Sequence, residues 1–446
     1  MYKYLVAFAL VTPLVGIWLV EGGEYAGSVG VDGYPNGATA AFATYAAAVA
    51  VIAWLCSGRR NRLVTAPLAE ANTPFRRFSN NLMLFNGVFL VVFLFGFGAI
   101  SVWLGAVSKG EFRVSLGWFG AIPNLMSKFI VPALVAYAAM LYSRSSRTFE
   151  MKVRLALVFL LAFAIGASWG FKSTAMSALL PALLLLYWRV RPVALLMLAA
   201  IFVGTLMLFF QIFDTHNDVG VDMQTYLLTR VTVLQGDVAW YVWGLYTSGE
   251  PFPNYWPTWL ALVGDKLLGI LGVSRTDPYE WMLHHYDWMI NYLADVPLET
   301  TEEGHSVVAT PFAEGLIAGG IGGLALFTTI AGVLIGSMYR LIDRALRSGH
   351  DIQAAIGATY FCYHLLPWAI SGAIVQLFHI SLLISLGTTL LALVVMRRFS
   401  LQQFLNPPSR RRRSVAPQPQ PAVTAEQDGV FARPPLTGSS RQVRTR

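Results

Sequence analysis

The residues of this sequence that are best suited to chemistry are four cations in otherwise acidic loops. They are Lys109, Arg113, Lys172 and Arg230. Acidic loops repel an anion, so isolated cations among them indicate a place that receives a negatively charged ligand. The alternative for Arg113 and Arg230 is an ordinary surface ion pair. The alternative for Lys172 is a solvent-exposed position at the tip of a loop.

The segment 302–323 holds a second candidate group. Glu314 follows Pro311 by about one helical turn and enters an apolar stretch, where a carboxylate is costly without a cation or a wet cavity. His305 lies just before that stretch, so the two residues could supply a base and its charge partner. The alternative is that Glu314 pairs with a structural arginine while the glycines serve packing alone. Glycines at this density let helices pack closely or break them, and they are Gly315, Gly319, Gly320, Gly322 and Gly323.

Two further histidines and the two cysteines are expected to have structural roles. We expect His364 and His379 to be core histidines that hydrogen-bond to a neighbouring helix. Cys56 and Cys362 are the two cysteines of the chain, and their positions favour neither a disulfide nor a zinc site.

Composition assigns the chain to the membrane proteins. Its 446 residues are 56% hydrophobic and 13% charged, whereas soluble domains carry about 25% charged residues. Runs of roughly 18 or more apolar residues recur, long enough to cross about 30 Å of hydrocarbon. The runs are continuous and do not alternate, so they predict helices and exclude a barrel.

We therefore expect an all-α polytopic protein with about ten membrane helices. The domains are predicted as membrane helices over 1–210, a large, partly helical periplasmic loop over 211–306, membrane helices again over 307–396, and a disordered basic cytoplasmic tail over 397–446. The expected spans are 3–20, 38–56, 80–104, 121–142, 153–169, 173–188, 192–210, 307–339, 353–371 and 375–396.

Basic residues indicate which loops share a side. Arginines and lysines gather in loops separated by two spans, which places all of these loops and both termini in the cytoplasm of a bacterial inner membrane. The same rule resolves the stretch 153–188. A single helix would put its two basic flanks on opposite sides, so we predict a hairpin that turns at 169–173, with Lys172 at the outer end.

The loop 211–306 is too long to be a simple connector. We expect a helix over 224–247, and the tryptophans of 251–288 suit either the lipid headgroup level or stacking on sugar rings. Lys128, near the outer end of the span 121–142, either lines a cavity or snorkels to the interface.

Three local features resemble the Wzy-type oligosaccharide repeat-unit polymerases and, more distantly, the O-antigen ligases. One is Lys109-Gly-Glu-Phe-Arg113 with Gly117 and Gly120 leading into a helix. Another is Gly170-Phe-Lys172-Ser-Thr. The third is His305-Ser-x-x-x-Thr-Pro311-x-x-Glu314-Gly after the large outer loop. The resemblance in topology covers most of the chain.

The resemblance implies a GT-C-like architecture and a glycosyltransferase activity. A nascent glycan on undecaprenyl diphosphate would pass to a sugar hydroxyl of a new lipid-linked repeat unit, giving O-antigen, capsular or exopolysaccharide. Arg113, Lys172, Arg230 and Lys109 would hold the diphosphate, and His305 or Glu314 would orient the hydroxyl. Several family members carry arginine where this chain has Lys172.

No cofactor or metal is expected, because protein cations suffice and no Asp-x-Asp motif is present. The expected partners are the lipid-linked oligosaccharide, membrane lipids, a chain-length regulator and a flippase, and not nucleic acid. Three alternatives remain open: a ligase that transfers finished glycan, a transporter or flippase of lipid-linked sugars, and a non-catalytic member of an export complex. No internal repeat of the transporter kind is visible.

Overall fold

The computed structural model describes residues 1–58, 72–170, 172–189, 229–250, 285–302 and 307–398, together with the single positions 204, 225, 255 and 282. Its first half consists of helices α1 (Tyr2–Glu21), α2 (Ala38–Cys56), α3 (Asn72–Val91), η1 (Val92–Gly96), α4 (Ile100–Trp103), α5 (Lys109–Ser115), η2 (Gly117–Gly120), α6 (Ala121–Leu125), η3 (Met126–Ile130), α7 (Val131–Ser143), α8 (Phe149–Ala167), α9 (Lys172–Ser177) and α10 (Leu180–Leu186). A two-residue antiparallel ribbon, β1 (Tyr25–Ala26) with β2 (Val31–Asp32), joins α1 to α2.

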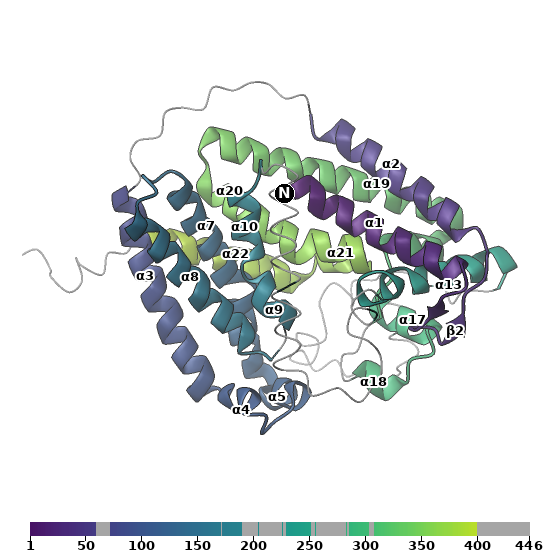
Figure 1. Cartoon of the computed structure of the whole chain (residues 1–446), viewed down its shortest axis with the longest axis horizontal. Helices are drawn as coiled ribbons and strands as arrows, with labels where there is room; N and C mark the ends of the chain where they lie inside the picture. The colour runs from purple at the N-terminus through teal and green to yellow at the C-terminus, as the bar shows by residue number, and fades with distance from the viewer. Residues whose placement is uncertain are drawn as a thin grey trace, which may run out of the picture. The chain divides into compact units, whose positions relative to one another are not determined.

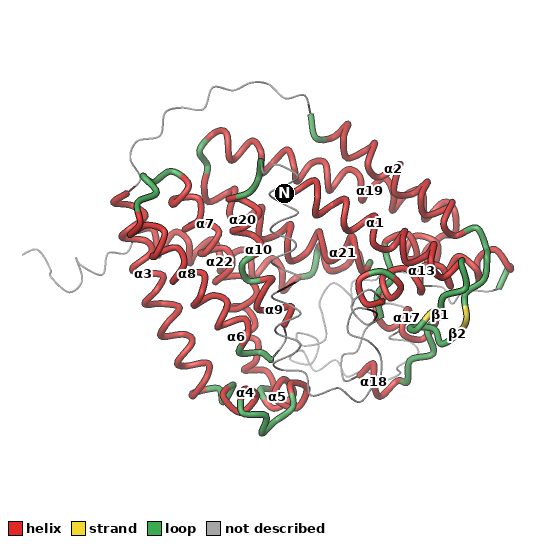
Figure 2. Tube along the Cα trace, viewed as in Figure 1, coloured by secondary structure: helices red, strands yellow, loops and turns green. Residues whose placement is uncertain are grey.

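The second half is also helical (Figure 2). It contains α13 (Val233–Ser248), α17 (Tyr286–Leu293), α18 (Leu298–Glu302), α19 (Pro311–Ser348), α20 (Asp351–Tyr360), η5 (Phe361–Leu365), α21 (Leu366–Ser371), η6 (Ile374–Leu377) and α22 (Ile380–Arg398). Three of the short elements, η1, η3 and η5, are π-helical turns inside longer helices.

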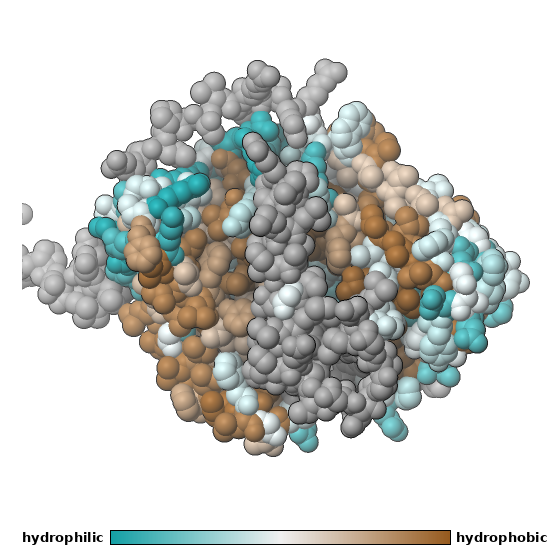
Figure 3. Space-filling model, viewed as in Figure 1, coloured by the Kyte–Doolittle hydropathy of each residue, from teal (hydrophilic) through white to brown (hydrophobic). Residues whose placement is uncertain are grey.

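Six helices of the described part are long and apolar enough to cross a membrane, as expected for an all-α membrane protein. They are Tyr2–Glu21, Ala38–Cys56, Asn72–Gly96, Ala121–Ser143, Pro311–Ser348 and Ile374–Arg398. Large apolar side chains stay exposed on their flanks, among them Val88 and Phe95 of α3 and η1 and Trp54 of α2. Figure 3 shows such apolar side chains spread over the surface of the helices. Lipid covers a surface of this kind at no cost.

Helix α7 forms the centre of one group of helices. Every residue from Val131 to Leu141 is buried, and the helix packs against α3, α8, α10 and α20 (Figure 1). A helix that is apolar all round is either buried among other helices or spans a membrane in contact with lipid, and α7 is enclosed by other helices.

A second group is formed by α1, α2, α13 and α19, and small residues allow its helices to approach closely. Helices α2 and α19 run side by side (Figure 1). A Cβ on Gly336 of α19 would lie 2.4 Å from the carbonyl oxygen of Ala53 in α2, and a Cβ on Gly16 of α1 would lie 2.1 Å from the carbonyl oxygen of Thr232 before α13. Both contacts therefore require glycine.

The basic segments meet at one end of the bundle, which we call the basic end. Arg144 pairs with Asp351, Arg76 with Glu150, and Arg77 donates to the backbone carbonyl of Arg398. Gly58 after α2 lies near the Arg340 side chain. The opposite end carries the α1–α2 loop and the first residues of α19.

The structure confirms several expected elements and shifts others. Helix α2 has the predicted bounds 38–56, and 153–188 forms the predicted hairpin, with its turn between α8 and α9. The helix expected over 224–247 includes α13 (Val233–Ser248), and the described positions 225 and 229–231 before it are helical as well. Helix α13 packs along the membrane helix α1 because Gly16 and Gly236 allow close approach. The expected span 80–104 begins earlier and is interrupted after η1. Apart from position 204, the expected span 192–210 lies outside the described residues, and so do residues 399–446 of the tail expected over 397–446.

Candidate functional site

Helix α19 is sharply folded near its start. Its backbone is non-helical at Gly319 and Gly320, and the φ of +57° at Gly320 is one that favours glycine. In a straight helix, Gly315 and Gly323 would be about 12 Å apart along the axis. Here a Cβ on Gly323 would lie 2.2 Å from the carbonyl oxygen of Gly315. The short leg 311–318 therefore folds back against the main part of α19, and the glycines serve both close packing and a break, as the sequence indicated.

Glu314 lies in this short leg and is fully buried. Its Oε1 accepts hydrogen bonds from the backbone N–H of Ile374, at 2.8 Å, and from the hydroxyl of Tyr255, at 3.3 Å. Its Oε2 accepts the indole N–H of Trp368, at 3.3 Å. The partners that hold this carboxylate are thus neutral donors, and none of these three is the arginine that the simpler interpretation of the sequence required.

Tyrosine hydroxyls line one side of this carboxylate and remain protonated. Burial raises the pKa of Tyr255, and the nearby Glu314 carboxylate raises it further. Burial likewise raises the pKa of Tyr286, whose ring lies 5.7 Å from that of Tyr255, centroid to centroid. The Tyr286 hydroxyl contacts the carbonyl oxygens of Ala309 and Thr310, at 3.3 and 3.2 Å, just before α19. Both tyrosines therefore act as donors at neutral pH.

A second helix break faces Glu314. Helix α21 ends at Ser371, and Gly372 and Ala373 have φ angles of +79° and +64° before the short turn η6. A Cβ on Gly372 would lie 2.3 Å from Cε1 of Tyr286, so this position needs glycine for space as well as for its backbone. Left-handed Ala373 costs about 1 kcal/mol and persists only where its surroundings hold it.

Side chains from several elements hold the link between α21 and α22. Glu314 binds the Ile374 N–H, the Gln376 Nε2 donates to Asp287 of α17 at 3.3 Å, and the Tyr360 hydroxyl donates to the Leu377 carbonyl at 3.2 Å. Irregular backbone at membrane depth is tolerated only where such partners satisfy it. We call this assembly the Glu314 junction: Tyr255, Tyr286, Asp287, Glu314, Trp368, Gly372, Ile374 and Gln376.

The predicted cations lie on different elements. Lys109 is the first residue of α5 and Arg113 is exposed on the same helix, while Lys172 is the first residue of α9. The ring of Phe112, next to Arg113, packs on that of Trp169 at 6.2 Å, so α5 lies beside the turn that leads to Lys172. These three positions belong to neighbouring elements.

Arg230 belongs to a different element from that group. Arg230 is exposed just before α13, and its carbonyl accepts a bond from Gln235 Nε2 at 3.1 Å. It is positioned by the packing of α13 on α1. His305 lies outside the described residues, so only Glu314 of the predicted base pair can be described.

The π-helical turns η3 and η5 position other polar residues. The ring of His364 in η5 stacks on Phe129 of η3, with centroids 5.2 Å apart, and lies 5.4 Å from Tyr360. The indole N–H of Trp169 donates to Ser127 of η3 at 2.8 Å. His364 is thus packed among aromatic rings, which agrees with its expected place in the core. Lys128, exposed in η3, lies next to Phe129.

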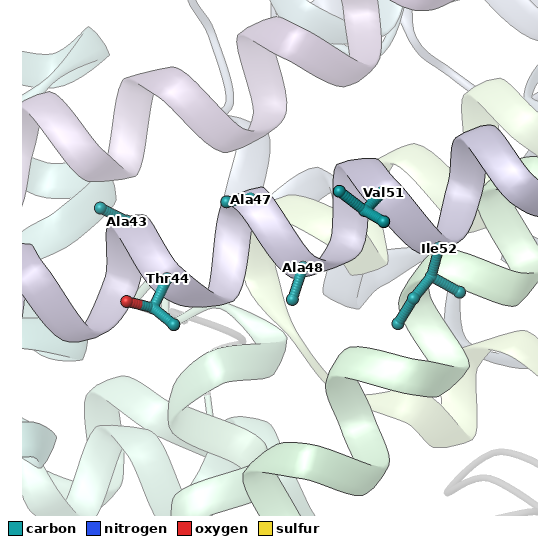
Figure 4. A pocket seen from close by; sticks show the side chains of 6 residues that line it. All are labelled: Ala43, Thr44, Ala47, Ala48, Val51 and Ile52. Carbon is teal, nitrogen blue, oxygen red and sulfur yellow. The ribbon is translucent and has the colours of Figure 1, made fainter.

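A groove lies on the flank of α2, away from these polar groups (Figure 4). It is lined by Ala43, Thr44, Ala47, Ala48, Val51 and Ile52. Its walls are small and apolar, and Thr44 bonds the carbonyl of Ala40 within its own helix. The groove therefore suits lipid chains and offers no group for chemistry.

Sequence reasoning found Glu314 but missed the residues that surround it. Tyr255 was visible only as one aromatic residue of a Pro-rich stretch, and Trp368, Ile374 and Gln376 carried no signal of their own. Their meeting depends on two helix breaks about 50 residues apart, a relationship that no local pattern encodes.

Comparison with known proteins identifies no relative of this chain. No family model matches it. No curated protein and no solved structure matches it either. The geometry of the junction and the pattern of the sequence therefore carry the functional argument.

Proposed function

We propose that the chain is a membrane glycosyltransferase that polymerises lipid-linked oligosaccharide repeat units. The carrying observation is the Glu314 junction, where Tyr255 and α17 of the segment 211–306 meet two interrupted helices of the membrane part. A lipid-linked sugar has its lipid in the bilayer and its sugars in water. An enzyme for it needs a site where water-facing and membrane segments are joined, and this junction has that construction.

The proposed reaction takes place on the side opposite the basic end. By the positive-inside rule the basic end faces the cytoplasm, so the junction faces the periplasm of a bacterial inner membrane. Both termini are then cytoplasmic, and about ten spans are expected once 192–210 is included. A GT-C-like architecture remains part of this proposal.

Each step of the proposed reaction can be assigned to residues that the sequence analysis singled out. The oxygen of an acceptor sugar hydroxyl attacks the anomeric carbon of the nascent glycan, and the bond from that carbon to undecaprenyl diphosphate breaks. The diphosphate leaves with the bonding electrons, and Arg113, Lys172, Lys109 and Arg230 stabilise its charge. His305 or Glu314 receives or orients the hydroxyl proton.

The hydrogen bonds of Glu314 bear on its role as the group that takes the proton. Glu314 is buried with three donors on its two oxygens, so a substrate hydroxyl reaches it only after one of those bonds opens. We therefore propose that Glu314 positions the junction, and His305, which lies outside the described residues, is the other candidate for the proton.

Reconstitution tests the proposal. Purified protein in liposomes would be mixed with the undecaprenyl-diphosphate repeat unit of its host, and the products separated on a gel. We expect a ladder of chain lengths that shortens in Arg113→Ala. Arg340→Ala, an exposed arginine at the basic end, is the matched control and should leave the ladder intact. No ladder with an active substrate, or equal effects of both variants, would contradict the proposal.

A transporter of lipid-linked sugars is the second candidate, and one observation favours it. Interrupted helices that face one another, here at Gly319–Gly320 and at Gly372–Ala373, are typical of secondary transporters. In the same liposomes, movement of the lipid-linked sugar between leaflets without any ladder would favour this function. A ligase would give a single product on a different acceptor.

A further inference from the structure

The link between α21 and α22 is bound by side chains of other elements. Of the side-chain bonds on this link, the one from the Ile374 N–H to Glu314 is the shortest, at 2.8 Å, and its acceptor is a carboxylate. The bonds at Gln376 and Leu377 are 3.3 and 3.2 Å long. The Glu314 bond is therefore the closest side-chain contact that the structure gives this link.

The link is also built to move. Gly372 and Ala373 interrupt the helical backbone on one side, and the φ of +64° at Ala373 stores strain that a rearrangement would release. On the other side, the four-residue turn η6 ends two residues before α22. The turn is closed by two backbone bonds, from the Gln376 N–H to the Ala373 carbonyl at 2.9 Å and from the Phe378 N–H to the Val375 carbonyl at 3.0 Å. Its other bonds go to side chains of neighbouring elements, so the turn is not part of a continuous helix.

The acid itself lies on a leg that can move with it. Glu314 belongs to the leg 311–318, which is separated from the rest of α19 by Gly319 and Gly320. Tyr246 of α13 packs against Gly320, where a Cβ would lie 3.2 Å from its ring. The kink at Gly319 and Gly320 therefore has a flexible backbone, and Tyr246 packs against it from α13.

We propose that the link 372–379 is a gate and that Glu314 is the latch that closes it. In the closed state the carboxylate binds Ile374, Trp368 and Tyr255 together. When the Ile374 bond opens, the link swings about Gly372 and exposes the carboxylate toward Asp287 and the segment 285–302. This device does not depend on the proposed polymerisation and would serve a transporter equally well.

Hydrogen exchange of the full-length protein in nanodiscs, read by mass spectrometry, tests the gate. In the wild type, peptides covering 372–379 should exchange measurably, while peptides from 38–56 and 131–141 remain protected. In Glu314→Ala the exchange of 372–379 should rise about tenfold with the other peptides unchanged. Glu314→Gln keeps an oxygen for Ile374 and should give an intermediate rise. The matched control is Glu299→Gln, an exposed acid of α18, which should change nothing.

Two results would overturn the gate. One is a wild-type link that is as protected as 131–141, which would make it a static joint. The other is a rise in exchange that spreads through all helices of Glu314→Ala. If that variant does not fold, Trp368→Phe decides, because it removes one donor and keeps a smaller aromatic ring at that position. We then expect a smaller rise confined to 372–379, and an unchanged or a general rise would refute the latch.

Discussion

The basic end and the opposite end of the helix bundle satisfy their carboxylates by different means. At the basic end the described acids bind arginine: Asp351 binds Arg144, Asp343 binds Arg347, and Glu150 binds Arg76 and Arg154. At the opposite end the acids bind neutral donors. Glu21 accepts the N–H groups of Asn36 and Thr39, Asp237 accepts that of Ser28, and Glu314 accepts three donors.

This difference bears on Arg113. The acids named at the opposite end fasten one element to another through backbone and aromatic N–H or O–H groups and not through this arginine. Arg113, described and exposed, makes no ion pair with a described residue. A cation in that position can bind an anion without first breaking an internal pair.

The largest effect should come from removing the Glu314 carboxylate. Glu314→Ala leaves the donors of Tyr255, Trp368 and Ile374 without their acceptor in a buried place, and we expect a loss of about 3 kcal/mol. Thermal unfolding in detergent, followed by size-exclusion chromatography, would show it. Glu299→Ala serves as the exposed control. A variant as stable as the wild type would mean that the junction contributes nothing.

The next largest effect concerns the ion pair between Arg144 and Asp351 at the basic end. The Arg144 and Asp351 side chains, 2.5 Å apart, are only 14% and 13% exposed. Arg144→Ala should therefore cost about 2 kcal/mol by removing the arginine that binds Asp351, less than the Glu314 change because both groups keep some exposure. The double variant Arg144→Met/Asp351→Leu should recover most of that stability, because no buried charge remains. If the double variant is as unstable as the single one, the charges are not the cause.

A smaller effect concerns pH at Asp237. Burial raises the pKa of this carboxyl, although the N–H groups of Ser28 and Val238 oppose the shift. A raised folded-state pKa contributes stability that is full below the ordinary value of about 3.9 and is lost as pH rises through the folded-state value. The stability of Asp237→Asn relative to the wild type should therefore increase as the pH rises from about 4 to about 8. A difference in unfolding temperature between Asp237→Asn and the wild type that does not change with pH would contradict this. Asp32→Asn, at an exposed acid, is the control.

The smallest effect, with the opposite pH sign, belongs to Glu150. Its bond to Arg154, together with Arg76, lowers its pKa, so its contribution is present above the ordinary value of about 4.3 and is lost as pH falls. Both partners in the Arg76 pair are about half exposed. Arg76→Ala should change the unfolding temperature only slightly, and salt should remove the change. A large effect that is insensitive to salt would show a buried role.

The sequence predicted the helices well because lipid makes hydrophobicity decisive. The bounds of α2 and the break among the glycines of 315–323 follow from local composition. The hairpin at 153–188 follows from the basic loops on either side of it, which must share one side of the membrane. The start of α13 and its place on α1 do not, since they depend on the fit of Gly16 to Gly236.

The candidate site was predictable only in part. An acid in an apolar run identifies Glu314, because its burial is costly wherever it occurs. The identity of its partners could not be foreseen, since Tyr255 and Ile374 come from segments separated from it by about 60 residues. Nor does the sequence reveal that Gly372 makes room for Tyr286.

Photo-crosslinking tests most directly whether the Glu314 junction handles a lipid-linked sugar. A lipid-linked repeat unit with a diazirine on its acceptor sugar would be bound to the protein in nanodiscs, illuminated and mapped by peptide sequencing. We predict cross-links in peptides covering 286–293 and 372–379 that disappear with excess unlabelled unit. Cross-links that are confined to the groove of α2 and that persist with excess unlabelled unit would contradict the assignment of the site.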